Sequence, residues 1–147
     1  MAHRIKLPET RIRFFETRSH RSPVEDYILR QPKRDQAVLT RTLDLLVRLG
    51  FHIHRLSDVR LVRLTPWLFE LRVKGDAFHR IMLLRERESE FVLVHAYAGK
   101  PWAGAEEEAR TAQRRIASWV ARHSETADRE RRVGSHGLER GPKKTAP

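Results

Sequence analysis

Apolar and polar residues alternate most regularly between Trp67 and Lys100, where the pattern predicts three antiparallel strands joined by two tight turns. Gly75-Asp76 is a strong turn signal, and a three-residue loop from Gly75 to Ala77 keeps the apolar positions of the first two strands on one face. A two-residue loop would turn the second strand over. The second turn is expected at Glu88-Ser89. The residues then expected on the core face are Trp67, Phe69, Leu71, Val73, Ile81, Leu83, Val92, Val94 and Ala96.

The segment before this stretch predicts a short strand and two helices. Arg11–Phe15 alternates basic and apolar residues, as a half-buried strand does. Ser22-Pro23-Val24-Glu25 is a helix start with a capping serine, and this helix is expected to end near Arg30 because Pro32 follows. Lys33–Leu49 carries leucines at helical spacing and is followed by Gly50, a typical helix stop.

The remaining segments complete an α+β pattern. Residues 51–65 form a basic connector, and residues 105–123 form a third helix whose Glu106, Glu107 and Glu108 suit its positive end. Residues 1–10 are expected to be a flexible lead-in, residues 11–123 one domain, and residues 124–147 a disordered basic tail. The predicted fold is therefore α+β, with an N-terminal strand and two helices, then a twisted antiparallel sheet and a C-terminal helix.

Charge narrows the class of partner. The chain has 30 Lys and Arg residues against 19 Asp and Glu, so its formal net charge is +11. Such an excess favours a polyanion or an acidic protein as partner, although a solvated basic surface gives the same composition. Cysteine is absent, which excludes disulfides, thiolate metal sites and a cysteine nucleophile. No apolar run is long enough for a membrane span or resembles a secretory signal, so we expect a soluble cytoplasmic protein without a membrane partner.

The solvent face of the predicted sheet carries residues that suit phosphate chemistry. With the three-residue loop, Arg72 faces Arg80 directly, and a two-residue second turn pairs Arg80 with Tyr97 and Met82 with His95. Two arginines side by side repel each other unless an anion bridges them, and guanidinium groups bind phosphate with fixed geometry. Histidine exchanges a proton near neutral pH. We therefore predict a metal-free phosphodiester site with no cofactor, formed by Arg72, Arg80, His95, Tyr97 and Lys100.

A purely structural account of the same residues stays open. His95 can be a half-buried histidine with all its hydrogen bonds satisfied, and Arg72 can pair with Glu70 or with another carboxylate. Further basic residues are candidates for RNA-backbone contacts, and the alternative for these is solvated surface. They are Lys74, Arg41, Arg48, Arg55, Arg60 and Arg63. No histidine spacing predicts a metal site.

The chain resembles toxins of the RelE/ParE superfamily, closest to the HigB-type, phage-derived branch. The N-terminal RFFETRSHRSPVEDYI and the leucine-rich helix ending in LG resemble the first half of that family. WLFELRV, HRIMLL and FVLVHAY resemble its three strand motifs, in the same order. The resemblance covers residues 11 to 119. One departure is that Ala98 and Gly99 stand before a single lysine, where the family has a lysine pair.

This resemblance implies the toxin of a type II toxin–antitoxin system, a RelE-like fold, and metal-independent endoribonuclease (hydrolase) activity that cleaves mRNA on the ribosome and inhibits translation. Arg72 and Arg80 fall on phosphate-contacting positions, His95 falls in the strand that supplies proton-transfer groups, and Lys100 falls near the basic cluster that follows it. The partners implied are mRNA, the ribosome and a cognate helix-turn-helix antitoxin. The alternatives are a ParE-like gyrase inhibitor and a degenerate relative that only binds RNA or an antitoxin. The oligomeric state is open.

Overall fold

The computed structural model describes residues 10–55, 59–99 and 105–140, with side chains of the last helix up to Ser124. The chain forms two compact units, Met1–Arg115 and Ile116–Pro147. The first unit contains the sheet, two helices and the first turns of the C-terminal helix. The second contains the rest of that helix.

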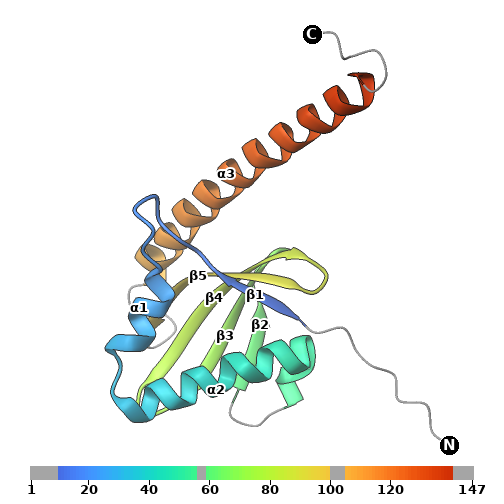
Figure 1. The fold of residues 1–147 in the computed structure, drawn as a ribbon. Coiled ribbons are helices and arrows are strands. Elements are labelled where there is room, and N and C mark those ends of the chain that lie inside the picture. The colour runs from blue at the N-terminus through green and yellow to red at the C-terminus, as the bar shows by residue number, and fades with distance from the viewer. Residues whose placement is uncertain (1–9, 56–58, 100–104, 141–147) are drawn as a thin grey trace, which may run out of the picture. The chain divides into compact units, whose positions relative to one another are not determined.

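A five-stranded sheet forms the centre of the first unit, with the strand order β1-β5-β4-β3-β2 (Figure 1). Its strands are β1 (Arg11–Phe14), β2 (Val59–Arg63), β3 (Leu68–Lys74), β4 (Phe78–Arg87) and β5 (Glu90–Ala98). β1 is parallel to β5, and all other neighbours are antiparallel. The predicted α+β class is confirmed, because the sheet is mostly antiparallel and the helices precede and follow its main strands.

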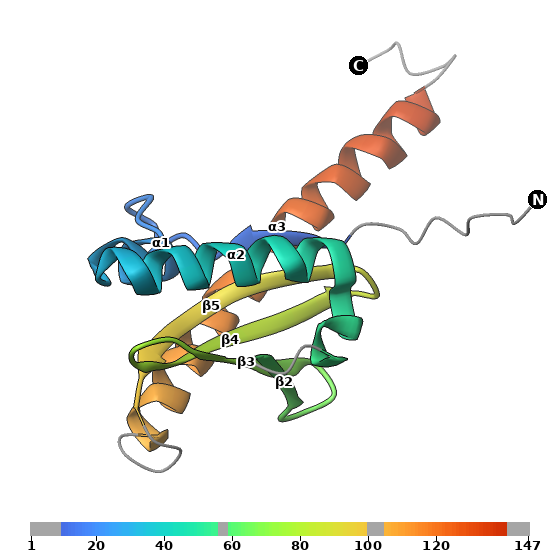
Figure 2. The ribbon, with the colours of Figure 1, turned by 90° about the horizontal axis from the view of Figure 1, so that it is seen from below.

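Helices cover one face of the sheet along most of its length. α1 (Pro23–Arg30) and α2 (Lys33–Leu49) lie on the same side, followed by the short 3₁₀ helix η1 (Gly50–Arg55) (Figure 2). The main core lies between these helices and the sheet. Its fully buried members include Val24, Leu39, Leu46, Leu71 and Leu93. The first turns of α3 (Ala105–Arg140) lie against the opposite face, where residues up to Arg115 contact β5.

The predicted register is confirmed between β3 and β4, and between β4 and β5 as far as Met82 and again at the second turn; Leu83, Leu84 and Arg85 are shifted by one residue. Lys74 pairs with Phe78 across a three-residue loop, and Arg72 pairs with Arg80. Arg80 pairs in turn with Tyr97, and Met82 with His95. The turn at Glu88-Ser89 also lies at its predicted position, since Arg87 pairs with Glu90.

A β-bulge at Val94 overturns part of the predicted core face. Met82 pairs with His95 but Leu83 pairs with Leu93, so Val94 is an extra residue on β5. The bulge shifts the alternation by one residue. As a result Leu93 belongs to the core under the helices, whereas Val92 and Val94 are buried outside that cluster. Ala96 keeps its predicted side.

Four other predictions differ from the structure. The connector contains a strand, β2, which pairs with β3 from Val59 to Arg63. Trp67 is 65% exposed because it lies in the bend before β3 begins. Ser22 stands at the N-cap of α1 without a side-chain capping bond, and Pro23 starts the helix instead. α3 continues past His123 to Arg140, where the sequence contains Glu, Ala and Arg, which have high helix propensity.

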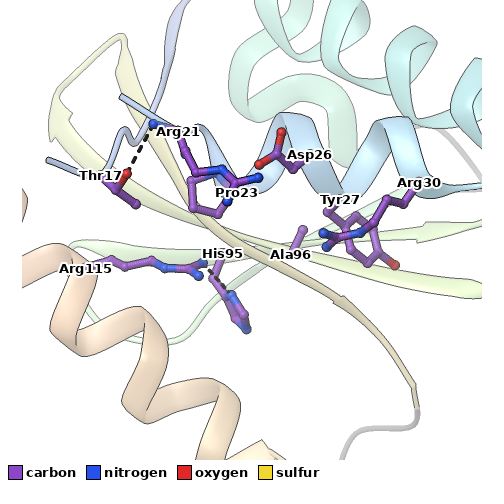
Figure 3. Close-up of a pocket in the computed structure, with 9 residues that line it drawn as sticks. All are labelled: Thr17, Arg21, Pro23, Asp26, Tyr27, Arg30, His95, Ala96 and Arg115. Carbon is purple, nitrogen blue, oxygen red and sulfur yellow. Dashed lines mark hydrogen bonds between the residues drawn. The ribbon is translucent and has the colours of Figure 1, made fainter. Parts of the chain in front are cut away.

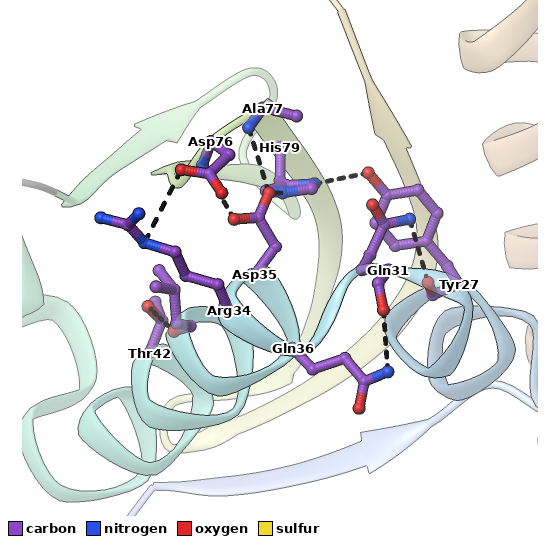
Figure 4. A network of polar contacts seen from close by, with 10 residues as sticks. Tyr27, Gln31, Arg34, Asp35, Gln36, Thr42, Asp76, Ala77 and His79 are labelled. Carbon is purple, nitrogen blue, oxygen red and sulfur yellow. Dashed lines mark hydrogen bonds and ion pairs between the residues drawn. The ribbon is translucent and has the colours of Figure 1, made fainter.

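A buried polar network ties α1 and α2 to the turn between β3 and β4 (Figure 4). Asp35 of α2 accepts hydrogen bonds from the backbone N–H groups of Asp76 (2.8 Å) and Ala77 (3.0 Å). His79 lies with Nε2 2.6 Å from Asp35 Oδ2 and with Nδ1 2.6 Å from the Tyr27 hydroxyl. The two backbone bonds and His79 lower the pKa of Asp35 to about 2. The ionised carboxylate only accepts, so Nε2 of His79 carries a proton. The network fixes the turn that sets the register of β3 and β4.

Candidate functional site

Two neighbouring rows of side chains cross the sheet on the face away from α1 and α2. The first row runs through Arg60, Arg72, Arg80 and Tyr97, which are successive cross-strand partners on β2, β3, β4 and β5. The structure therefore brings together the two arginines and the tyrosine that the sequence pattern places side by side. It also adds Arg60, because β2 pairs with β3. Three arginines in one row concentrate positive charge on this face of the sheet.

A buried glutamate partly neutralises this row. Glu70, the next residue on the same face of β3, accepts a hydrogen bond from Arg72 Nε at 2.9 Å through its Oε1 and another from Arg80 Nη1 through the same oxygen. Arg80 also donates from Nε to the Gly99 carbonyl at 3.2 Å. Glu70 and Arg80 are only 4% and 3% exposed. The anion that relieves the repulsion between Arg72 and Arg80 is thus a protein carboxylate in this structure, as the structural account of these residues allows.

His95 stands in the second row, in which Glu70, Met82 and His95 are successive cross-strand partners on β3, β4 and β5. Two residues of α3 hold its ring. Its Nε2 bonds to Glu108, and its Nδ1 lies 2.8 Å from Arg115 Nη1. Arginine can only donate, so Nδ1 accepts and the ring proton lies on Nε2, facing the Glu108 carboxylate. Burial lowers the pKa of His95 below its ordinary value of 6.5, although Glu108 acts in the opposite direction. His95 is therefore a neutral imidazole with a defined tautomer at neutral pH.

Tyr97 lies beside His95, with the two rings stacked at 5.6 Å between centroids. Burial raises the pKa of Tyr97 above its ordinary value, and Glu70 adds to the effect. The hydroxyl therefore keeps its proton at neutral pH and can act as a hydrogen-bond donor or a general acid. The pair provides a proton acceptor and a proton donor within one patch of β5.

The prediction that this site faces solvent is wrong, because most of it is buried. Arg80 is 3% exposed, Tyr97 8% and His95 9%, and of the four predicted site residues that the structure describes only Arg72 has a partly open side chain, at 27%. Strand alternation indicates a second sheet face but does not reveal what packs on it. The first turns of α3 cover that face, with Ala112 fully buried and Glu108 bonded to His95.

The residues predicted to contact RNA backbone are mostly on the surface. Those with exposed side chains are Arg41, Arg48, Arg60, Arg63 and Lys74. Arg60 and Lys74 lie on the same sheet face as Arg72, whereas Arg41 and Arg48 belong to α2, which packs against the other face. They therefore do not form one continuous surface. Lys100 and the side chain of Arg55 lie outside the described residues.

Sequence reasoning missed Glu108 and Arg115 as members of the site. Glu108 belongs to an acidic run at the start of α3, which is fully explained by the positive end of a helix. Arg115 Nη1 also donates to the Val94 carbonyl at 3.0 Å, at the residue that forms the bulge. No local signal marks either residue, because each acts across 13 or more positions of the sequence.

The site is thus a partly neutralised arginine row next to a histidine–tyrosine pair, on an α+β domain with a mostly antiparallel sheet. Within the described residues, no group of three or more His, Asp or Glu side chains could hold a metal ion, and no helix is long and apolar enough to cross a membrane. A scan of protein-family models gives no match to this sequence, and a search of curated proteins gives none either.

Proposed function

We propose that this protein is a RelE/HigB-like toxin of a type II toxin–antitoxin system: a cytoplasmic, metal-independent endoribonuclease that cleaves mRNA on the ribosome. The observation that carries the proposal is the row Arg60, Arg72, Arg80 and Tyr97 with His95 beside it. Arginines supply fixed donors for a phosphate whose charge grows in the transition state, and the two ring side chains supply proton transfer. The order of elements and the strand motifs that resemble this superfamily point the same way.

In this proposal the chemistry is divided among the residues by their surroundings. Arg72 is the arginine of the pair that solvent reaches, so it makes first contact with the phosphate, while Arg60 and Lys74 bind the flanking backbone. His95 is neutral and can accept the proton of a 2′-hydroxyl that attacks the adjacent phosphate. Tyr97 is protonated and can donate to the leaving 5′-oxygen.

Burial places one requirement on this mechanism. A phosphodiester reaches His95 only if the first turns of α3 withdraw and both bonds of the His95 ring break, the one to Glu108 and the one from Arg115. The second bond matters most for proton transfer, because Arg115 occupies Nδ1, the ring nitrogen that accepts a proton. The conservative change Glu108→Gln weakens the charge-assisted bond to His95, so we expect faster cleavage from this variant. Neutralisation by a helix-turn-helix antitoxin, the proposed partner, would require an acidic surface that covers Arg60 and Lys74.

The test is mRNA cleavage by purified full-length protein in a translating system. We expect His95→Gln and Tyr97→Phe to lower the cleavage rate by about 100-fold or more, the usual contribution of a general acid or base. Arg87→Ala, at an exposed arginine that ends β4, should leave the rate unchanged. If the wild-type protein cuts no mRNA while a positive control does, the nuclease proposal fails.

A second candidate function is RNA or antitoxin binding without cleavage. Two carboxylates favour this candidate: Glu70 is bonded to Arg80 and Glu108 to His95, so neither side chain is available to a phosphodiester in this structure. This candidate predicts salt-dependent RNA binding by a protein that leaves the RNA intact. Gel-shift binding and cleavage measured on the same RNA separate the two candidates.

A further inference from the structure

A pocket of about 290 Å³ lies beside β5, which contributes His95 and Ala96 to its lining (Figure 3). β1 pairs with β5 only as far as Phe14 and Leu93. Beyond that point the outer edge of β5 has no strand partner in the described part of the chain. The loop before α1, one side of α1 and the first turns of α3 complete the pocket.

Positive charge dominates the lining of this pocket. Arg21 comes from the loop before α1, Arg30 from the end of α1, and Arg115 from α3, and Asp26 is the one carboxylate that lines the pocket with them. Arg21 and Arg30 form no ion pair within the described residues, whereas Arg115 uses Nη1 for Val94 and His95.

Three guanidinium groups from separate elements therefore share the pocket with a single carboxylate. Burial lowers the pKa of Arg115 and nearby Arg114 adds to the effect, whereas Glu108 acts in the opposite direction. A phosphate group supplies the missing negative charge, and its oxygens match the fixed donor geometry of guanidinium.

The rest of the lining suits a nucleoside rather than an anion alone. Asp26 can accept hydrogen bonds from ribose hydroxyls or base amino groups, and Thr17 can donate or accept. Pro23 and the ring of Tyr27 give the pocket an apolar side. The volume is at the small end of the range for ligand sites, about 300–1,000 Å³, which suits a single nucleotide.

We infer that this pocket binds one phosphorylated nucleoside, with the phosphate on Arg21, Arg30 and Arg115 and the nucleoside against Asp26 and Tyr27. The ligand is either a free nucleoside monophosphate or the 5′-phosphorylated end of an RNA strand. The inference does not rest on RNA cleavage, because it concerns equilibrium binding. Arg115 links the pocket to the candidate site, since its Nη1 lies 2.8 Å from His95 Nδ1.

The experiment is calorimetric titration of the full chain at low salt with the four nucleoside 5′-monophosphates, with inorganic phosphate, and with an RNA tetranucleotide with and without a 5′-phosphate. We expect 1:1 binding of a monophosphate or of the phosphorylated RNA. Arg21→Ala and Arg30→Ala, at exposed positions that folding tolerates, should each weaken this binding about tenfold. The matched control is Arg87→Ala, which removes the same charge at the end of β4, opposite the first residue of β5, and should change affinity less than about twofold.

The titration separates the possible ligands. Preference for the phosphorylated tetranucleotide assigns the pocket to an RNA end, and equal or better binding of the mononucleotide assigns it to a free nucleotide. If inorganic phosphate binds as tightly as every nucleotide, the inference that the pocket recognises a nucleoside is overturned. Absence of phosphate-dependent binding, or an equal loss in Arg87→Ala, overturns the site. NMR signals of the His95 ring should shift when ligand binds to the wild type, with no cleavable RNA present.

Discussion

The most direct test of the site concerns Glu70, whose single oxygen Oε1 holds both Arg72 and Arg80. The substitution Glu70→Gln keeps the size of the side chain and one accepting oxygen but removes the negative charge. Arg80 would then remain buried, at 3% exposure, with no carboxylate to oppose it. The change therefore isolates the electrostatic role of Glu70 from its packing.

The expected loss of stability follows from burial. Removal of one member of a buried ion pair costs about 3–5 kcal/mol, because the remaining charge is left uncompensated in the interior. The substituted amide still accepts one hydrogen bond and Arg72 is partly open to solvent, so we expect a loss of about 3 kcal/mol. That is a large share of the roughly 5–15 kcal/mol that stabilises a typical domain, and it corresponds to a decrease in Tm on the order of 10 °C.

Urea unfolding at neutral pH should compare the wild type, Glu70→Gln, Arg80→Met and the double variant. The loss of unfolding free energy in the double variant should be smaller than the sum of the two single losses by at least about 1.5 kcal/mol, since Arg80 is then no longer a buried charge without a partner. Glu90→Gln is the matched control. Glu90 pairs at 3.7 Å with Arg87, which is 82% exposed, and such a pair contributes at most about 1 kcal/mol.

Two results would contradict this role of Glu70. If Glu70→Gln is within about 0.5 kcal/mol of the wild type, the Glu70 carboxylate does not balance a buried charge. If the loss is large but shows no coupling to Arg80→Met, the charge of Glu70 acts through another group, such as Arg72, and does not balance Arg80.

Buried groups and a tight turn give three more predictions. The pKa of Asp35 falls from 3.8 to about 2 on folding, so its contribution to stability is complete well above pH 3.8 and is lost as the pH falls toward 2. In acid unfolding, the free energy of unfolding of Asp35→Asn should therefore depend less steeply on pH in this range than that of the wild type. Burial lowers the pKa of His95, so as the pH drops below 6.5 the His95 ring takes up a proton in the unfolded chain before it does so in the folded protein, and the stability should fall. An NMR titration that gives a pKa above 6.5 for His95 would mean that the bond to Glu108 outweighs burial. Gly75→Ala should cost about 2 kcal/mol in urea unfolding, because a Cβ there would lie 2.6 Å from Asp35 Oδ1; a neutral result would mean that the turn yields easily.

Much of the central sheet could be predicted from local pattern. Two tight turns and regular alternation fix which residues face each other, and the pairs Arg72–Arg80 and Arg80–Tyr97 follow from them. The helix Lys33–Leu49 is equally predictable, because its leucines recur at helical spacing and Gly50, at φ 53°, ends it. The bulge at Val94 is not predictable. Phe91 to Val94 are all apolar, so the sequence there shows no alternation of apolar and polar residues that an extra residue could interrupt.

The placement of Arg72, Arg80 and Tyr97 side by side, with His95 near them, is therefore predictable from the sequence alone, because turn length and the alternation of each strand are local properties. Arg60 joins this row only in the tertiary structure, where β2 pairs with β3. The surroundings of these residues depend on the tertiary structure. Glu70 reaches across to Arg80 from the neighbouring strand, and α3 brings Glu108 and Arg115 onto His95 from a distant part of the chain. Burial and charge compensation depend on which elements pack together, and such long-range contacts are not encoded in the pattern of any single segment.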